Sequence, residues 1–189
     1  MKFISNILVF CLFFLLGCTQ KPPLPYLAGR LSVKLNDREL TDQYPVKLRE
    51  AYTIKDNPRD GCEEPIRIGF MFYDKKNLLR AGLVWQKTDL SLGKFQVQGR
   101  KADCDQGTYV GVNFYSMIGG DVSGDYYDVI PSPENFFELL SYDEAGKKVR
   151  GKFAITLVNR SKIDRLFPDT VRLTDGNFET EVGKTTQRF

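Results

Sequence analysis

Apolar and polar residues alternate along most of the chain after residue 30, which is the period-two pattern typical of half-buried β-strands. The clearest alternating segments are 31–35, 66–72, 79–85, 110–114 and 126–130, with a shorter piece at Phe95 and Val97. A turn is predicted at 74–77, and the glycine-rich run 119–124 predicts a connection. No long segment carries the 3.6-residue period of an amphipathic helix, so the pattern predicts an all-β fold with little helix.

The dipeptide Asp175-Gly176 predicts a hairpin near the C-terminus, because it favours a two-residue type I′ turn. Such a turn would pair Leu173 with Phe178 on the apolar face and Arg172 with Glu179 on the other face. Both pairings suit a ribbon that is buried on one side.

A second hairpin is predicted from 135–142 and 148–159, in a register that places Phe137 opposite Phe153. The alternative takes 133–140 as one or two helical turns, since its apolar spacing also fits a 3.6-residue period. We favour strands, because the hairpin register separates apolar from charged residues on both strands.

These strands predict a single antiparallel β-sandwich over residues 30–189, with a lipocalin-like closed β-barrel as the alternative. The length suits one domain that can bury its own core without a cofactor. A second domain is not expected.

Residues 1–17 have a different pattern, with Lys2 at the start and an apolar run from Ile7 to Leu16. This is the layout of a secretory signal, and the run is too short to span a bilayer, which takes about 20 apolar residues. The sequence Leu15-Leu16-Gly17-Cys18 resembles the bacterial lipobox. The resemblance implies that 1–17 is a lipoprotein signal peptide and that Cys18 is acylated, for example with palmitate. The alternative is an ordinary signal peptide with an incidental cysteine.

Residues 18–29 contain Pro22, Pro23 and Pro25 and no apolar period, so they predict an extended tether after the lipidated cysteine. The resemblance implies a protein held on the bacterial cell envelope through its lipid anchor, which contacts the membrane. Thr19 in place of Asp resembles the pattern that permits export to the cell outer membrane. The domain would then face the periplasm or the surface.

Cys62 and Cys104 are the cysteines left after cleavage of the signal and lipidation of Cys18. In an oxidising compartment they predict a disulfide, which would stabilise the fold by about 3–4.5 kcal/mol. The alternatives are two free thiols or a thiolate metal site, for which two cysteines without histidine are a poor ligand set.

The charged and nucleophilic residues exclude several functions. The formal charge is +3 with both signs interspersed, which gives no argument for nucleic-acid binding. The chain has no histidine, which excludes Ser-His-Asp and Cys-His catalysis and histidine-ligated metals. Ser91 and Lys94 match the Ser-x-x-Lys pattern of penicillin-recognising enzymes, but the chain lacks their size and partner motif, so we interpret the match as chance. We expect no enzymatic activity.

A disulfide between Cys62 and Cys104 would draw acidic side chains together into a weak candidate site for Ca²⁺. These are Asp60, Glu63, Glu64, Asp103 and Asp105. The alternative is a solvated loop whose charge is offset by Arg59, Arg100 and Lys101. A still weaker candidate comprises Asp121, Asp125 and Asp128. Otherwise no cofactor is expected.

Seven aromatic residues, several of them at positions assigned to the outer face, are candidates for a binding surface, since a ring offers a large contact area with a polar tip. They are Trp85, Tyr115, Tyr126 and Tyr127, together with Tyr109, Phe136 and Tyr142. The alternative reading makes them cross-strand pairs within packed sheets.

The segments 141–144, 151–153 and 171–178 resemble the C-terminal third of the small, uncharacterised β-rich lipoproteins of Bacteroidota. The resemblance implies a fold and a cellular address but no catalytic residue. We therefore expect a membrane-anchored envelope lipoprotein that acts as a non-catalytic binding or assembly module, with an envelope protein or a glycan as partner. The alternatives are a small-ligand carrier with a β-barrel cavity and, ranked last, a carboxylate-dependent hydrolase.

Overall fold

The computed structural model describes residues 29–44, 46–55, 66–87, 90–97, 110–119, 121–143, 145 and 147–184. Several sequence predictions fall outside these residues: the signal peptide 1–17, lipidation of Cys18 and the tether that follows it, the disulfide between Cys62 and Cys104, and the acidic site that this disulfide would create. They stay predictions.

The described chain consists of eleven β-strands and one helical turn. In chain order these are β1 (Gly29–Leu35), β2 (Arg38–Glu39), α2 (Leu40–Gln43), β3 (Lys47–Lys55), β4 (Ile66–Tyr73), β5 (Leu79–Lys87), β6 (Gly93–Gln96), β7 (Val110–Ile118), β8 (Val122–Val129), β9 (Phe136–Asp143), β10 (Lys148–Asn159) and β11 (Thr170–Lys184). The prediction of an all-β chain with little helix is confirmed.

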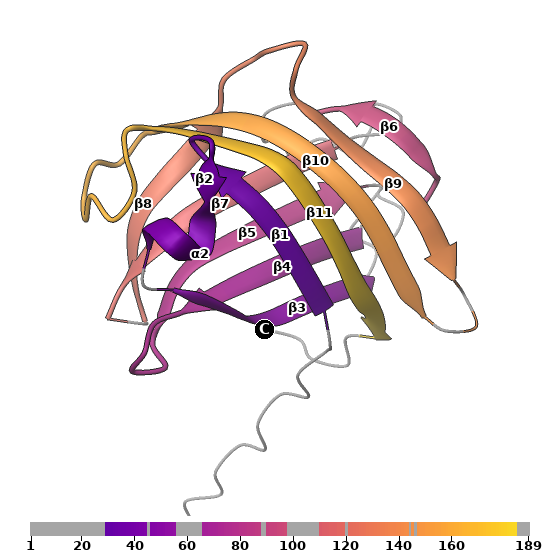
Figure 1. Cartoon of the computed structure of the whole chain (residues 1–189), viewed down its shortest axis with the longest axis horizontal. Helices are drawn as coiled ribbons and strands as arrows, with labels where there is room; N and C mark the ends of the chain where they lie inside the picture. Colours follow the sequence, from indigo (N-terminus) through magenta and orange to yellow (C-terminus); the bar gives the residue numbers. More distant parts are fainter. Residues whose placement is uncertain are drawn as a thin grey trace, which may run out of the picture.

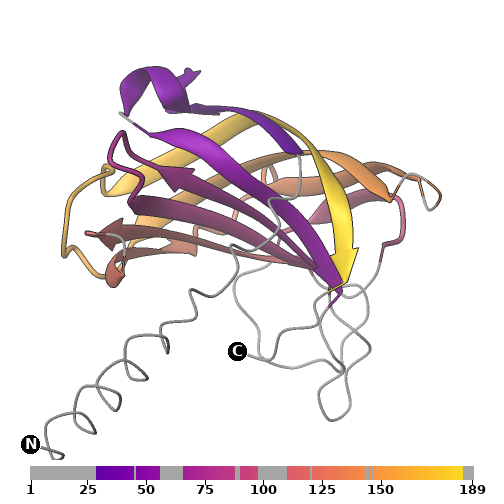
Figure 2. The same cartoon turned by 90° about the horizontal axis from the view of Figure 1, so that it is seen from below.

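The strands form one sheet that folds into two layers around a common interior (Figure 1). One layer contains β3, β4, β5, β7 and β8, and the other contains β1, β11, β10 and β9, with the short β2 and β6 at its edges. Figure 2 shows the yellow β11 curving over the same interior as the magenta strands β4 and β5. The predicted β-sandwich is therefore confirmed.

The two layers meet at two corners, where strands cross from one layer to the other. The end of β10 pairs with β8 over three residues, and the end of β11 pairs in parallel with β3, also over three residues. Such corners are typical of sandwiches whose strands bend between sheets. Because β2 pairs with β1 alone and β6 with β9 alone, the sheet keeps two edges and is not the lipocalin-like closed barrel.

The predicted hairpin of β9 and β10 is confirmed in type and in register. Phe137 pairs with Phe153 and Glu138 pairs with Lys152. The 3.6-residue interpretation of this segment is wrong, because β9 is extended from Phe136 to Asp143. Phe137, Leu139, Val149 and Phe153 of this hairpin are buried in the interior, and the charged residues of β10, Lys148, Arg150 and Lys152, are exposed.

The predicted hairpin at Asp175-Gly176 is wrong, because β11 continues through it as one strand. Asp175 adopts a left-handed backbone conformation, with φ of +52°. The register shifts opposite it in both neighbouring strands, β1 and β10, so the extra residue forms a β-bulge. A type I′ turn and this bulge both require a residue in the left-handed conformation, so the dipeptide is compatible with either. Here β11 pairs with β1 on one side and β10 on the other, which keeps it extended.

Aromatic rings fill the interior between the layers. The Trp85 ring lies 4.8 Å from the Phe137 ring and 5.0 Å from the Phe153 ring, between centroids. Phe178 stacks on Phe137 at 5.6 Å. Trp85 and Tyr127 are both buried, so their assignment to a binding surface is wrong. Each of these rings lies on the inner face of its layer, where it contacts other aromatic rings of the core.

Gly151 in β10 lies directly against the ring of Phe178, and a Cβ atom there would overlap that ring and the Glu138 carbonyl oxygen. Gly151→Ala should therefore lower the free energy of unfolding by about 1–3 kcal/mol. Urea denaturation followed by circular dichroism measures the change. Lys152→Ala is the control, since its side chain is exposed on the same strand, and it should cost under about 0.5 kcal/mol. Equal midpoints for the two variants would contradict the close contact.

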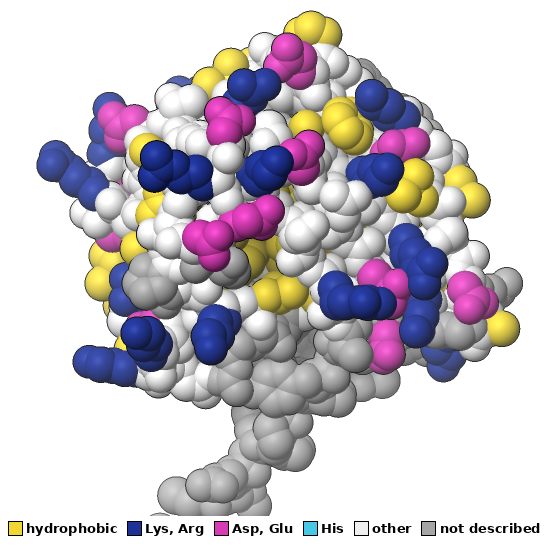
Figure 3. Space-filling model, viewed as in Figure 1, with side chains coloured by type: hydrophobic (Ala, Val, Ile, Leu, Met, Phe, Trp, Pro, Cys, Tyr) yellow, Lys and Arg dark blue, Asp and Glu magenta, His cyan; other side chains and the backbone are white. Residues whose placement is uncertain are grey.

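The surface carries both charge signs intermixed. On the face shown in Figure 3, basic and acidic side chains alternate, with apolar groups scattered among them. Among the described residues, the structure contains no helix with the length and apolar character needed to cross a bilayer.

Candidate binding cleft

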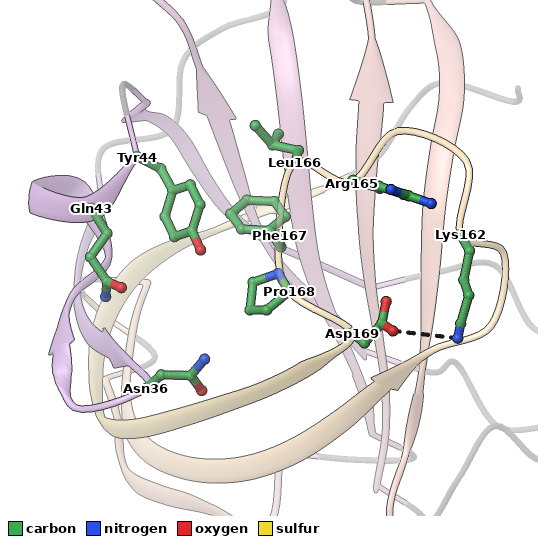
Figure 4. A pocket seen from close by; sticks show the side chains of 9 residues that line it. All are labelled: Asn36, Gln43, Tyr44, Lys162, Arg165, Leu166, Phe167, Pro168 and Asp169. Atoms are coloured by element: carbon green, nitrogen blue, oxygen red, sulfur yellow. Dashed lines mark ion pairs between the residues drawn. The ribbon is translucent and has the colours of Figure 1, made fainter.

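An open pocket of about 790 Å³ lies at one end of the sandwich, and we call it the distal cleft. Its nine lining residues are Asn36, Gln43, Tyr44, Lys162, Arg165, Leu166, Phe167, Pro168 and Asp169 (Figure 4). One wall comes from α2 and the turn after β1, and the other from residues 160–169, the distal loop, between β10 and β11. The cleft lies at the end of β1 opposite Gly29, where the described chain begins.

The distal loop is built around the carboxylate of Asp125, a buried residue of β8. Its Oδ1 accepts hydrogen bonds from the backbone N–H groups of Ile163 and, at 3.4 Å, Asp164. Its Oδ2 accepts one from the N–H of Arg165 at 3.0 Å. Three consecutive amides of the loop are thus satisfied by one side chain from a neighbouring strand, which fixes the loop to the sandwich.

These contacts also set the ionisation of Asp125. Burial by itself raises the pKa of this carboxyl group. Hydrogen bonds from the Ile163, Arg165 and Asp164 amides, with a further contribution from the Asn159 side chain, together outweigh burial and hold the pKa below its ordinary value. The carboxylate is therefore charged at neutral pH and acts as a strong acceptor for the loop.

Two further side chains position the distal loop. The Asn159 Oδ1 atom accepts the backbone N–H groups of Ser161 and Lys162, each at 2.9 Å. The Tyr127 hydroxyl donates to the Phe167 carbonyl oxygen at 3.2 Å. Burial, followed by the nearby acidic charges, raises the pKa of Tyr127 well above its ordinary value, so its hydroxyl remains a donor.

The distal loop adopts an energetically unfavourable backbone conformation at the two basic residues that line the cleft. Lys162 and Arg165 both have φ of +54°, in the left-handed region. This conformation costs a residue with a side chain about 1–2 kcal/mol, and the acceptors from Asp125 and Asn159 offset that cost. The fold thus holds both cations at one wall of the cleft.

The lining combines an apolar floor with charges at its rim. The rings of Tyr44 and Phe167 contact each other at 4.6 Å between centroids, with Pro168 beside them (Figure 4). Within the distal loop, Lys162 Nζ lies 3.3 Å from Asp169 Oδ2 (Figure 4). This arrangement suits a partly apolar ligand, whose apolar part would lie on the floor and whose polar groups would contact the charged side chains at the rim.

The aspartates predicted as a weak cation site do not meet. The carboxylate of Asp125 accepts hydrogen bonds from the distal loop. Asp128 pairs with Arg160 at 2.8 Å, and Asp121 is exposed. Across the described ranges, no cluster of three or more His, Cys, Asp or Glu side chains could hold a metal.

The remaining surface aromatics fit the cross-strand interpretation. Tyr115 of β7 and Tyr126 of β8 face each other, with ring centroids 6.3 Å apart. Phe136 lies beneath Lys94, whose Nζ atom is 4.1 Å from the ring centroid. Tyr142 packs against the core, and Tyr109 lies outside the described residues. These rings do not gather into one platform with the distal cleft.

The Ser-x-x-Lys match at Ser91 and Lys94 has no catalytic geometry, because Lys94 contacts a ring instead of the serine. Ser91 Oγ instead accepts a hydrogen bond from Lys87 Nζ at 2.8 Å. Lys87 is buried, and its Nζ lies 4.2 Å from the Phe95 ring centroid.

No protein-family model, no curated protein and no solved structure matches this chain. The fold defines a β-sandwich domain, and the distal cleft is identified by its own geometry. The sequence analysis missed its residues. The cluster of Asn159, Ser161 and Asp164 after a predicted strand was the one signal that could have indicated a structured loop.

Proposed function

We propose that this protein is an envelope lipoprotein, anchored through Cys18, that acts as a non-catalytic binding module and takes its ligand in the distal cleft. The observation that carries this proposal is the distal loop, which Asp125 holds in one conformation at the end of the domain away from Gly29. A rigid loop on a sandwich loses little entropy on binding. A tether at the opposite end would leave the cleft accessible.

Two features support binding at the end of the sandwich over the alternative functions. The described interior is packed with the rings of Trp85, Phe137 and Phe153, which supports an external cleft over a carrier cavity inside a barrel. Asp169 is the one acid that lines the cleft, and it is paired with Lys162. A glycosidase-type hydrolase requires two carboxyl groups.

The anchor can be tested by labelling with palmitate in a bacterial host. The wild-type protein should incorporate label and sediment with membranes, and Cys18→Ser should lose both properties because the acylated sulfur is absent. Cys11→Ser is the matched control, since Cys11 lies within the predicted signal peptide, and it should behave as the wild type. A labelled Cys18→Ser protein would refute the anchor.

The cleft can be tested by titrating the full mature protein with a library of small compounds and following its backbone amides by NMR. Compounds that bind should perturb residues 160–169 before any other segment, because these residues form one wall of the cleft. Perturbations concentrated in β6 and β9 would place the site elsewhere and contradict the proposal.

A further inference from the structure

We propose that the distal cleft binds a small monoanionic ligand, a carboxylate on an apolar or aromatic body, whose carboxylate is held by Arg165. This inference rests on the proposed function of the cleft as the binding site. It names the chemical class of the ligand and the residue that selects it.

The guanidinium of Arg165 is available to a ligand. Arginines elsewhere are held by acids, as in Arg150 with Glu179 and Arg160 with Asp128. Among the arginine side chains that the structure describes, Arg165 and Arg38 make no ion pair or hydrogen bond, and of these two only Arg165 lines the cleft. A guanidinium presents two parallel N–H donors that match a carboxylate.

The balance of charges at the cleft selects a single negative charge. Lys162 and Asp169 pair with each other, so their charges offset, and Arg165 is left as the uncompensated charge among the lining residues. A dianionic phosphate would be better matched by two or more free cations. One free arginine fits a monoanion.

The opposite wall fixes the direction in which the ligand lies. Asp37, Glu39 and Asp42 are exposed residues beside this wall, in the turn after β1, in β2 and in α2. They would repel a carboxylate placed there. The carboxylate should therefore point to the distal loop, with the rest of the ligand over Tyr44.

The floor of the cleft accommodates an apolar body. Tyr44, Leu166 and Pro168 supply ring and aliphatic surface, and the ring of Phe167 is buried beneath them. The volume of about 790 Å³ falls in the range of sites for small molecules, which is about 300–1,000 Å³.

The test uses hydrocinnamate and its uncharged amide as probes, which share a body and differ in the carboxylate. Each is titrated into the full mature protein, and the dissociation constant is obtained from the amide shifts of residues 160–169. The acid should bind up to about fivefold more tightly than the amide, as expected for one exposed ion pair. Arg165→Gln should abolish that preference.

Arg160→Gln is the matched control, because Arg160 begins the same loop but is paired with Asp128. It should keep the preference for the acid. Equal binding of acid and amide to the wild type, or an acid preference that survives Arg165→Gln, would overturn the carboxylate inference while leaving the cleft as the site. Loop shifts from neither probe would overturn this inference, and shifts confined to another part of the molecule would also remove the proposed function.

Discussion

Replacing Trp85 by alanine should lower the free energy of unfolding by about 3–5 kcal/mol, because it empties the centre of the ring cluster between the layers. Trp85 has no exposed surface and contacts Phe137 and Phe153. A loss of this size is a large part of the about 5–15 kcal/mol that holds a typical domain folded. Urea denaturation followed by circular dichroism measures it.

Two comparisons make the Trp85 result interpretable. Trp85→Phe keeps a ring in the cluster and should cost less than the alanine variant. Leu92→Ala removes a side chain that is 56% exposed and should cost under about 0.5 kcal/mol. A Trp85→Ala protein as stable as Leu92→Ala would show that the ring cluster is not the core of the domain.

Asp125→Ala should lower the free energy of unfolding by about 2–4 kcal/mol, since it leaves three backbone N–H groups of the distal loop without their acceptor. The amides of residues 163–165 should also exchange with solvent much faster, which NMR detects. Asp128→Ala is the control on the same strand, with an exposed ion pair to Arg160, and should cost under about 1 kcal/mol. Unchanged exchange in Asp125→Ala would contradict the role of this carboxylate.

The same carboxylate makes stability depend on pH. Its pKa in the folded protein lies below the unfolded value of about 3.9, so its contribution is fully present above that value and is lost as pH falls through the lower folded pKa. Glu179, whose pKa is held down by hydrogen bonds from Arg30 and Arg150, titrates in the same acidic range. Below about pH 4, wild-type stability should thus fall more steeply than that of Asp125→Asn, and parallel curves would exclude Asp125 as a source.

The sequence predicts the fold best where a single pairing register places apolar residues together on one face of a hairpin and opposite charges together on the other face. In the hairpin of β9 and β10, pairing Phe137 with Phe153 also places Glu138 beside Lys152, so no shifted register competes. β3 was not predicted, because the register shift between Leu48 and Glu50 breaks its alternation. Whether a β-bulge forms depends on which strand pairs with the segment, and the local pattern of apolar residues does not reveal that partner.

Burial in a two-layer fold explains the error at Trp85. The alternation of β5 places this ring on the face of Ala81 and Leu83, and both of these residues are buried with it. Its assignment to a binding surface followed from its chemistry, and the pattern of its own strand was the better guide. Tyr126, by contrast, alternates onto the outer face and is exposed.

The distal cleft was beyond sequence reasoning because its parts are distant in the chain. Asp125 accepts hydrogen bonds from residues 38 to 40 positions later in the chain. The ring of Tyr44, near the start of the domain, contacts the ring of Phe167, near its end. An aspartate on the inner face of a strand indicates a buried acceptor, but its partners depend on which loop the layers bring to it. The predicted strands therefore define the scaffold without defining the site.

The most direct test of the central claim, that Asp125 shapes the distal loop into a binding site, compares the affinity of the wild type and Asp125→Asn for hydrocinnamate. The account predicts shifts at residues 160–169 in the wild type and binding weakened about tenfold or more in the variant at neutral pH, where loosening the loop restores the entropy cost of ordering it. Equal affinity of the two proteins, or shifts confined to another part of the sandwich, would contradict it.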